Sequence, residues 1–395
     1  MDDQQSIGAR IADERKLRGW TQSKLAATAH VSLSLVKKVE EGSRPVTDGT
    51  IASVTKALGI ERNRLTGQPY FSGDRTIDSL HDHIPALRRE LTMYGLPADE
   101  AVAPDLVDLG RRTAISSALV HAATYARLAE MVPELLADLR AASFAATGHE
   151  RDRVMLLMSE VLDNAKRLTY DLGYPDLGVL CVSLEERAAE ESGDHLAVAV
   201  ARAVRAWTLT GAGSWSSAYR LLVATADNLP GDSLPRWSVW GFLQLQAALS
   251  SARSGDTERT WEHYAAAQHA ASQMDVDRDD YRLAFGPANT GIWGVGLAVE
   301  LQDGPAALTR AETLVIPALV PRARAGHHFM DLARAHVFNG DRAGAVASLQ
   351  TARRIAPQQA RFNPMARETV LTLARSERRS TESLRGLAVW MGIPD

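Results

Sequence analysis

Few side chains in this chain of 395 residues are grouped in a way that could perform bond-making chemistry. His327 and Asp331 lie four positions apart, so on a helix they would share a face and could form an ion pair. Two such ligands are too few for a zinc site, and the single cysteine, Cys181, can form neither an internal disulfide nor a multi-thiolate site. No Gly-rich phosphate loop, nucleophile elbow or HExxH motif occurs. We therefore expect no catalytic residues, no metal site and no cofactor.

Near the N-terminus, side chains with hydroxyl, amide and ammonium groups occur in short segments that have the pattern of helices. Such groups can form hydrogen bonds to a partner rather than catalyse a reaction. Thr21 and Ser32 are expected to cap a second and a third helix, the third running from Leu33 to Glu40. Gly42 would end the third helix, and two further short helices follow within residues 50–65. The expected core is made of apolar residues at helical spacing, which are Ile7, Ile11, Leu17, Leu25, Ala26, Val36, Val39, Ile51, Val54 and Leu58.

Four short motifs stand at a characteristic spacing in this region. They are Trp20-Thr21-Gln22-Ser23-Lys24-Leu25-Ala26, Val31-Ser32-Leu33-Ser34, Val39-Glu40-Glu41-Gly42 and Ala57-Leu58-Gly59-Ile60. In residues and spacing they resemble the XRE family, the lambda-repressor-like helix-turn-helix. The resemblance implies a domain over residues 1–66 that binds double-stranded DNA, with its third helix in the major groove.

The resemblance also implies which side chains would meet DNA. Lys38 would donate to guanine O6 or N7, and Leu33 would contact a thymine methyl group. Phosphate contacts are expected from Arg44, Lys24 and Arg18, while Gln22 would bond a phosphate or a neighbouring side chain. An ordinary solvated face is the alternative for the basic residues. The full expected DNA-binding set is Gln22, Ser32, Leu33, Ser34, Lys37, Lys38 and Arg44.

The distribution of charge agrees with a DNA-binding N-terminus. Residues 1–70 contain 11 Lys/Arg and 8 Asp/Glu, a balance of +3, although the whole chain carries −4. The remainder therefore carries −7, and DNA phosphates would repel it. No run of 18 apolar residues and no signal peptide is present, so we expect a cytoplasmic protein that does not enter a membrane.

The rest of the chain divides into a connecting segment and a long helical region. Gly67-Gln68-Pro69 and Ser72-Gly73 interrupt the helical pattern, so residues 67–103 are expected to form a linker and a connecting helix. Residues 104–395 are rich in alanine and leucine at helical period, which predicts an all-α domain. Interruptions near residues 148, 173, 193, 213, 231, 255, 275, 303, 318 and 340 indicate about five to seven helix pairs.

A weak repeat runs through this region. Gly340 is followed by Ala345, Ala352 and Pro357, and partial copies begin at Gly213 and Gly255. This spacing resembles the second half of a tetratricopeptide repeat, in which small residues let paired helices approach closely. The segments Phe285-Gly286-Pro287-Ala288-Asn289-Thr290, Ala356-Pro357 and Leu384-Arg385-Gly386-Leu387-Ala388 also resemble long XRE-type regulators of actinobacteria, which implies an α-solenoid attached to the DNA-binding domain.

A solenoid of helix pairs has a concave surface that can hold a small molecule or a peptide. Candidate ligand-binding residues are Trp207, Trp240, Asn289, Trp293 and His327. Core packing is the alternative for the tryptophans, a helix N-cap for Asn289 and an ion pair or core position for His327.

Two functions follow as hypotheses. The first is a homodimeric transcriptional regulator that binds an inverted-repeat operator and responds to an effector in its solenoid. The second is an interaction scaffold, in which the repeats bind a partner protein and the helix-turn-helix localises it to DNA.

Overall fold

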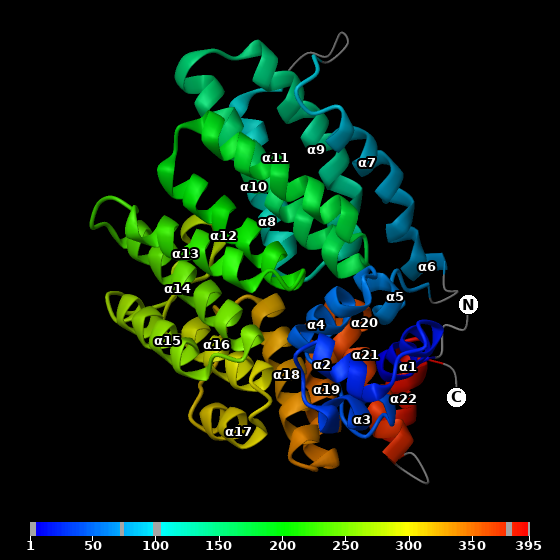
Figure 1. The fold of residues 1–395 in the computed structure, drawn as a ribbon. Helices are drawn as coiled ribbons and strands as arrows, with labels where there is room; N and C mark the ends of the chain where they lie inside the picture. The colour runs from blue at the N-terminus through cyan, green and yellow to red at the C-terminus, as the bar shows by residue number, and fades with distance from the viewer. Residues whose placement is uncertain (1–4, 72–74, 98–103, 377–380, 394–395) are drawn as a thin grey trace.

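The computed structural model describes residues 5–71, 75–97, 104–376 and 381–393, and within these ranges every regular element is a helix (Figure 1). An isolated antiparallel bridge between Arg278 and Phe285 is the one strand-like contact in the described residues. The predicted all-α class is confirmed.

Five helices form the N-terminal domain, which we call the head. They are α1 (Ile7–Leu17), α2 (Gln22–Thr28), α3 (Leu33–Glu40), α4 (Asp48–Leu58) and α5 (Arg62–Thr66). The expected caps are present, since Thr21 Oγ1 accepts the Lys24 N–H at 3.1 Å and Ser32 Oγ accepts the Leu35 N–H at 3.1 Å. The expected core is buried except for Leu17, which is 76% exposed. That prediction was wrong because Glu14 and Arg15 occupy the inner face of the last turn of α1.

The connecting segment is packed against the rest of the chain rather than extended through solvent. It contains α6 (Arg75–Asp78), the 3-10 helix η1 (Ser79–His83) and α7 (Ile84–Thr92). Tyr70, Leu80 and Leu87 are buried in one core cluster together with Leu128. The segment therefore joins the head to the following helices through an apolar contact.

The remaining helices form the body. They are α8 (Leu106–His121), α9 (Tyr125–Ala145), α10 (Gly148–Leu172), α11 (Pro175–Ser192), α12 (His195–Gly211), α13 (Trp215–Asp227), α14 (Leu234–Ser254), α15 (Thr257–Ala271), the 3-10 helix η2 (Asp280–Arg282), α16 (Pro287–Glu300), α17 (Gly304–Glu312), α18 (Arg322–Phe338), α19 (Arg342–Ile355), α20 (Pro357–Phe362), α21 (Pro364–Ser376) and α22 (Glu382–Trp390). Consecutive helices pack on one another, most extensively α10 on α11, α14 on α15 and α18 on α19. The helix ends fall at the interruptions expected from the sequence.

Small residues let these helices approach closely, as the repeat pattern predicts. Ala218, Ala267, Ala345 and Ala352 are all fully buried between paired helices. Gly340 has a φ of +76°, which a glycine adopts without the strain that a side chain would introduce. The alanines at these positions therefore lie inside the packed helices of the body.

The two ends of the body meet. Phe362 of α20 lies in the same core cluster as Tyr125 of α9, and Gln358 Oε1 accepts the Ala126 N–H at 3.1 Å. Helix α18 also packs against α8. The blue helices of the head lie beside the orange and red helices at the end of the chain (Figure 1). The head therefore lies near the place where the C-terminal helices of the body meet its N-terminal helices α8 and α9.

A candidate nucleic-acid interface on a docked head

One face of α3 is open to solvent. Leu33 is 36% exposed, and Ser34, Lys37 and Lys38 are exposed as well. Residues at i, i+1, i+4 and i+5 share one side of a helix, so these four side chains form a single surface. The opposite side of α3, with Val36 and Val39, is buried in the core of the head. The helix is therefore anchored on one side and presents two lysines on the other.

A buried carboxylate fixes the orientation of this helix. Glu40, at the end of α3, accepts Arg15 Nε at 2.7 Å and Arg15 Nη2 at 2.8 Å. Gln22 Nε2 donates to the same carboxylate at 2.8 Å. Burial alone would raise the pKa of Glu40, but the hydrogen bonds from Arg15 and Gln22 bring it below its ordinary value. We call Arg15, Gln22 and Glu40 the clasp, because together they tie α1, α2 and α3 to one another.

The sequence left two partners open for Gln22, a DNA phosphate or a neighbouring side chain. Its amide nitrogen bonds a neighbouring side chain, Glu40, in the structure. Ser32 is also engaged within the head, because its hydroxyl caps α3. These two residues therefore position α3, while Leu33, Ser34, Lys37 and Lys38 form its open face.

Arg44 does not lie on this open face. Its guanidinium is 4.8 Å from the centre of the Phe338 ring on α18, and its Nη2 is 3.4 Å from the carbonyl oxygen of Gln302. Burial lowers the pKa of Arg44. The expected phosphate contact is therefore not available to Arg44 in this arrangement, because its side chain joins the head to the body.

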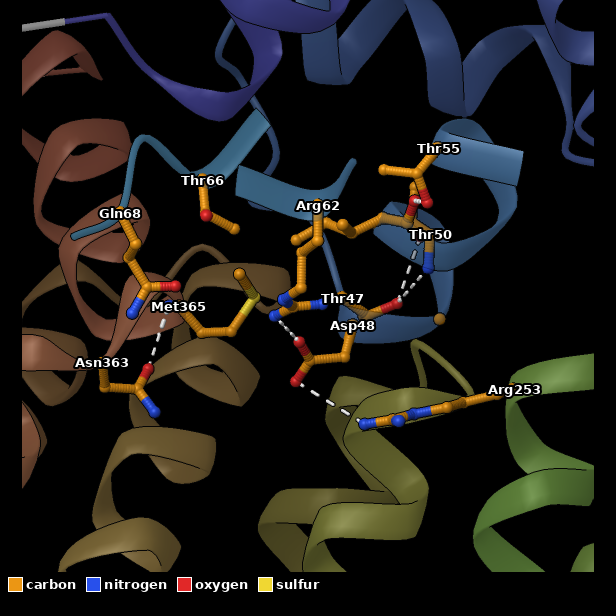
Figure 2. A network of polar contacts seen from close by, with 12 residues as sticks. Thr47, Asp48, Thr50, Thr55, Arg62, Thr66, Gln68, Arg253, Asn363 and Met365 are labelled. Atoms are coloured by element: carbon orange, nitrogen blue, oxygen red, sulfur yellow. Dashed lines mark hydrogen bonds and ion pairs between the residues drawn. The ribbon is translucent and has the colours of Figure 1, made fainter. Parts of the chain in front are cut away.

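Helices α4 and α5 of the head contact the body through a network of buried charges (Figure 2). Asp48, at the start of α4, forms ion pairs with Arg62 of the head and, at 3.6 Å, with Arg253 of α14. Arg253 also lies 3.5 Å from Glu300 of α16, whose second oxygen accepts the Gly49 N–H at 3.2 Å. Burial would raise the pKa of Asp48, but the charges of Arg62 and Arg253 lower it well below its usual range.

Further contacts surround this network. Glu368 Oε2 accepts the Ile7 N–H at 2.9 Å, and Lys56 Nζ donates to the Gly213 carbonyl at 3.1 Å. Asn63 Nδ2 donates to the Gly173 carbonyl at 2.9 Å. Met365 of α21 packs directly into the apolar core of the head. These contacts reach α1, α4 and α5, so they fix the position of α3 relative to the body.

Three of the five expected ligand-binding residues lie on two adjacent helices of the body. Asn289 and Trp293 lie on α16, and His327 lies on the adjacent helix α18. Trp207 is in contact with Tyr170 of α10, with ring centres 4.5 Å apart. Trp240 packs on Trp237, with ring centres 5.7 Å apart. The three expected tryptophans, Trp207, Trp240 and Trp293, all pack against one apolar cluster of the body.

Asn289 is not an N-cap, which corrects one interpretation of the sequence. The carboxylate of Asp277 caps α16 instead, accepting the Ala288 and Asn289 N–H groups at 2.9 Å each. Asn289 is 2% exposed, donates to the Ala284 carbonyl at 2.8 Å and accepts Arg324 Nε at 2.9 Å. Its amide is therefore used inside the protein and positions Arg324.

His327 lies beside the residue that the sequence pairs with it, with Nε2 3.6 Å from Asp331 Oδ2, although burial lowers the pKa of the imidazole. Arg324 and Tyr170, which lie beside the expected ligand-binding residues, were not foreseen. Nothing in the sequence distinguishes either of them from an ordinary surface residue on an amphipathic helix.

Comparison with known proteins identifies the head. Residues 11–65 match the family model of a helix-turn-helix, which extends from α1 to α5. The comparisons with curated proteins and with solved structures gave no match. Among the described residues, no helix is both long enough and apolar enough to cross a membrane.

Proposed function

We propose that this protein is a sequence-specific transcriptional regulator, in which the body holds an effector and sets the position of the DNA-binding head. The observation that carries the proposal is the open face of α3. This face presents Leu33, Ser34, Lys37 and Lys38 on a helix-turn-helix whose helix α4 is docked on the body.

The geometry suits reading of the major groove. A helix that inserts into this groove meets base edges with side chains from its N-terminal part. Lysine ammonium groups donate to guanine O6 and N7 or to phosphates, and an apolar side chain packs against a thymine methyl group. The clasp limits rotation of α3, so the entropy lost on binding DNA is reduced.

The docked head supports control by the body. Because contacts to α14, α16 and α21 fix α4 and α1, a change in the spacing of body helices would move α3. An effector, a small molecule or a peptide, would act by binding one arrangement of the helices better than another. We further propose that the helix pairs are degenerate tetratricopeptide-type repeats, and that two copies place their α3 helices on an inverted repeat.

Selection of binding sites from random DNA with the full chain tests this proposal. We expect an inverted repeat with half-sites about one helical turn apart, bound with affinity that falls steeply as salt rises. The Lys37→Ala/Lys38→Ala double variant serves as the negative control. Failure of the folded protein to enrich any sequence would overturn the proposal, and a co-purifying protein would then favour the scaffold.

A further inference from the structure

The turn that follows α3 has its one basic residue directed towards the body. This turn is Gly42-Ser43-Arg44, and the Arg44 guanidinium lies against the Phe338 ring of α18. Ser43 is exposed, and its N–H and hydroxyl both donate to the Lys38 carbonyl oxygen, at 2.9 and 3.0 Å. The turn therefore lies directly beyond the open face of α3, but its own arginine is directed away from that face.

A second arginine reaches the same turn from the body. Arg375 lies in the last turn of α21, and its side chain lies over Gly42. A Cβ atom built on Gly42 would lie 2.7 Å from Nη1 of Arg375 and 3.1 Å from its Cδ. The space that a side chain at this glycine would take is therefore occupied by an arginine from the other end of the chain.

Helix α21 holds Arg375 at this place because the helix is docked on the head. Met365 packs into the apolar core of the head, and Glu368 accepts the Ile7 N–H at 2.9 Å. Arg375 follows Glu368 by seven positions, or two helical turns, so both lie on the same side of α21, about 10 Å apart along its axis. This side of α21 therefore extends from the start of α1 to the turn after α3.

The Arg375 guanidinium can accept a partner from outside the chain. The residue is exposed. Among the described residues, no carboxylate oxygen lies within 4.0 Å of the guanidinium, including those of Glu41 and Glu368. Glu368 is 2% exposed and is already bonded to the Ile7 N–H. Arg375 can therefore donate to a new acceptor without breaking an ion pair within the described part of the chain.

The dimensions of α3 place this arginine beside a phosphate strand. The helix has 8 residues, which extend over about 12 Å, and the major groove of B-DNA is about 12 Å wide. When side chains at the start of α3 meet base edges, the end of the helix lies near the edge of the groove, where the phosphates are. Arg375 lies at this end, and a guanidinium matches the oxygens of a phosphate with two parallel N–H donors.

We propose that Arg375 binds a DNA phosphate at the edge of the major groove, where the sequence led us to expect Arg44. The DNA-binding surface would then consist of the open face of α3 and one arginine of the body. This inference rests on the proposed function, because it adds a residue to the same DNA interface. It also gives the body a direct influence on DNA affinity, since a movement of α21 relative to the head would withdraw Arg375 from the phosphate.

Mobility shifts of the full-length protein at several salt concentrations test this contact. The probes are the selected operator and a mixed-sequence duplex of the same length. We expect Arg375→Gln to weaken binding to both by about three- to tenfold without changing base preference, because a phosphate contact carries no sequence information. The slope of log affinity against log salt should fall in magnitude by about 1 for each arginine removed. Arg375→Lys keeps the charge and should retain the wild-type slope.

Arg354→Gln is the matched control. Arg354 is also exposed, so its loss removes the same charge from the C-terminal part of the chain. Its carbonyl oxygen lies 3.5 Å from Arg322 Nη2 at the start of α18, whereas the head meets α18 at its other end, at Phe338. Affinity and salt slope should therefore stay as in the wild-type protein.

A second measurement uses the wild-type protein alone. Phenylglyoxal modifies exposed arginine side chains, and peptide mass spectrometry locates the modified residues. We expect the mixed-sequence duplex to protect Arg375 and to leave Arg354 open to modification. Equal modification of Arg375 with and without bound DNA would contradict the contact.

The pattern of results separates this inference from the proposed function. A protein that selects an operator, with unchanged affinity and salt slope in Arg375→Gln, overturns the phosphate contact alone. Tighter binding by Arg375→Gln also overturns it, and indicates that Arg375 holds the head away from DNA. Reduced affinity and slope on the mixed-sequence duplex, without any selected operator, support the contact and refute the sequence-specific regulator. A folded protein that binds neither duplex refutes both.

Discussion

At the scale of single residues, Lys38 has the position of a base-reading side chain. It lies on the open face of α3, one turn from Ser34, and is exposed. We expect Lys38→Ala to weaken operator binding by about 1–3 kcal/mol and to relax the preference at one base pair, because a bond to a guanine edge is lost. Mobility shifts with the selected site and its single-base variants measure both effects.

The control for this variant is Arg153→Ala. Arg153 is exposed near the start of α10, so its loss removes the same charge far along the chain from α3. Operator affinity and base preference should stay as in the wild-type protein. If Lys38→Ala behaves like this control, Lys38 does not contact a base.

The clasp leads to a prediction about stability. Glu40→Ala leaves the Arg15 guanidinium, whose side chain is 10% exposed, buried without its carboxylate. Breaking a buried pair in this way costs about 3–5 kcal/mol. Gln22→Ala removes one hydrogen bond to Glu40, and we expect a loss nearer 1 kcal/mol. Hydrogen exchange of α3 amides compares the two variants, and similar exchange rates in both would show that the ion pair does not hold α3.

At the scale of elements, the crossing of α1 and α3 depends on the absence of a side chain at Gly8. A Cβ atom built there would lie 1.9 Å from the Val39 carbonyl oxygen, which belongs to the backbone of α3 and cannot rotate away. We expect Gly8→Ala to lower the free energy of unfolding by about 1–3 kcal/mol through overpacking. It should also weaken DNA binding, because α3 shifts.

Gly110→Ala is the matched control for this substitution. Gly110 also lies within a helix, α8, but a Cβ atom there would have no neighbour within 4 Å. Alanine favours the helix over glycine by about 0.5–1 kcal/mol, so this variant should be slightly stabilised. Urea unfolding of both variants gives the comparison, and stabilisation by Gly8→Ala would contradict the close packing of α1 on α3.

The elements were largely predictable from the sequence, because local signals set their ends. The cap at Ser32 and the stop at Gly42 gave α3 its bounds, and glycines with positive φ mark most interruptions of the body. The placement of Arg44 was not predictable, since it depends on how the head meets α18. Likewise, Ile7 and Glu368 are 361 positions apart in the sequence and meet only because the head docks on α21.

At the scale of the whole molecule, the head and the body form one packed unit at the junction. Glu368 of α21 is 2% exposed and accepts the Ile7 N–H at the start of the head. Burial raises the pKa of Glu368 from 4.5 to about 7, although the N–H groups of Ile7 and Gly8 and the charges of Arg375 and Arg10 oppose the rise. The folded protein therefore binds this proton more tightly than the unfolded chain does.

The sign of the resulting pH dependence follows from linkage. Stability from Glu368 is fully present below pH 4.5 and is lost as the pH rises through about 7. The loss is on the order of 1–3 kcal/mol. Glu368→Gln keeps the acceptor oxygen but cannot ionise, so its free energy of unfolding should fall less between pH 5 and pH 8 than that of the wild-type protein. Urea unfolding at the two pH values measures this difference, with Glu382→Gln, an exposed position on α22, as the control. If wild type and Glu368→Gln lose equal stability over this range, Glu368 is ionised in the folded protein and the junction does not respond to pH through it.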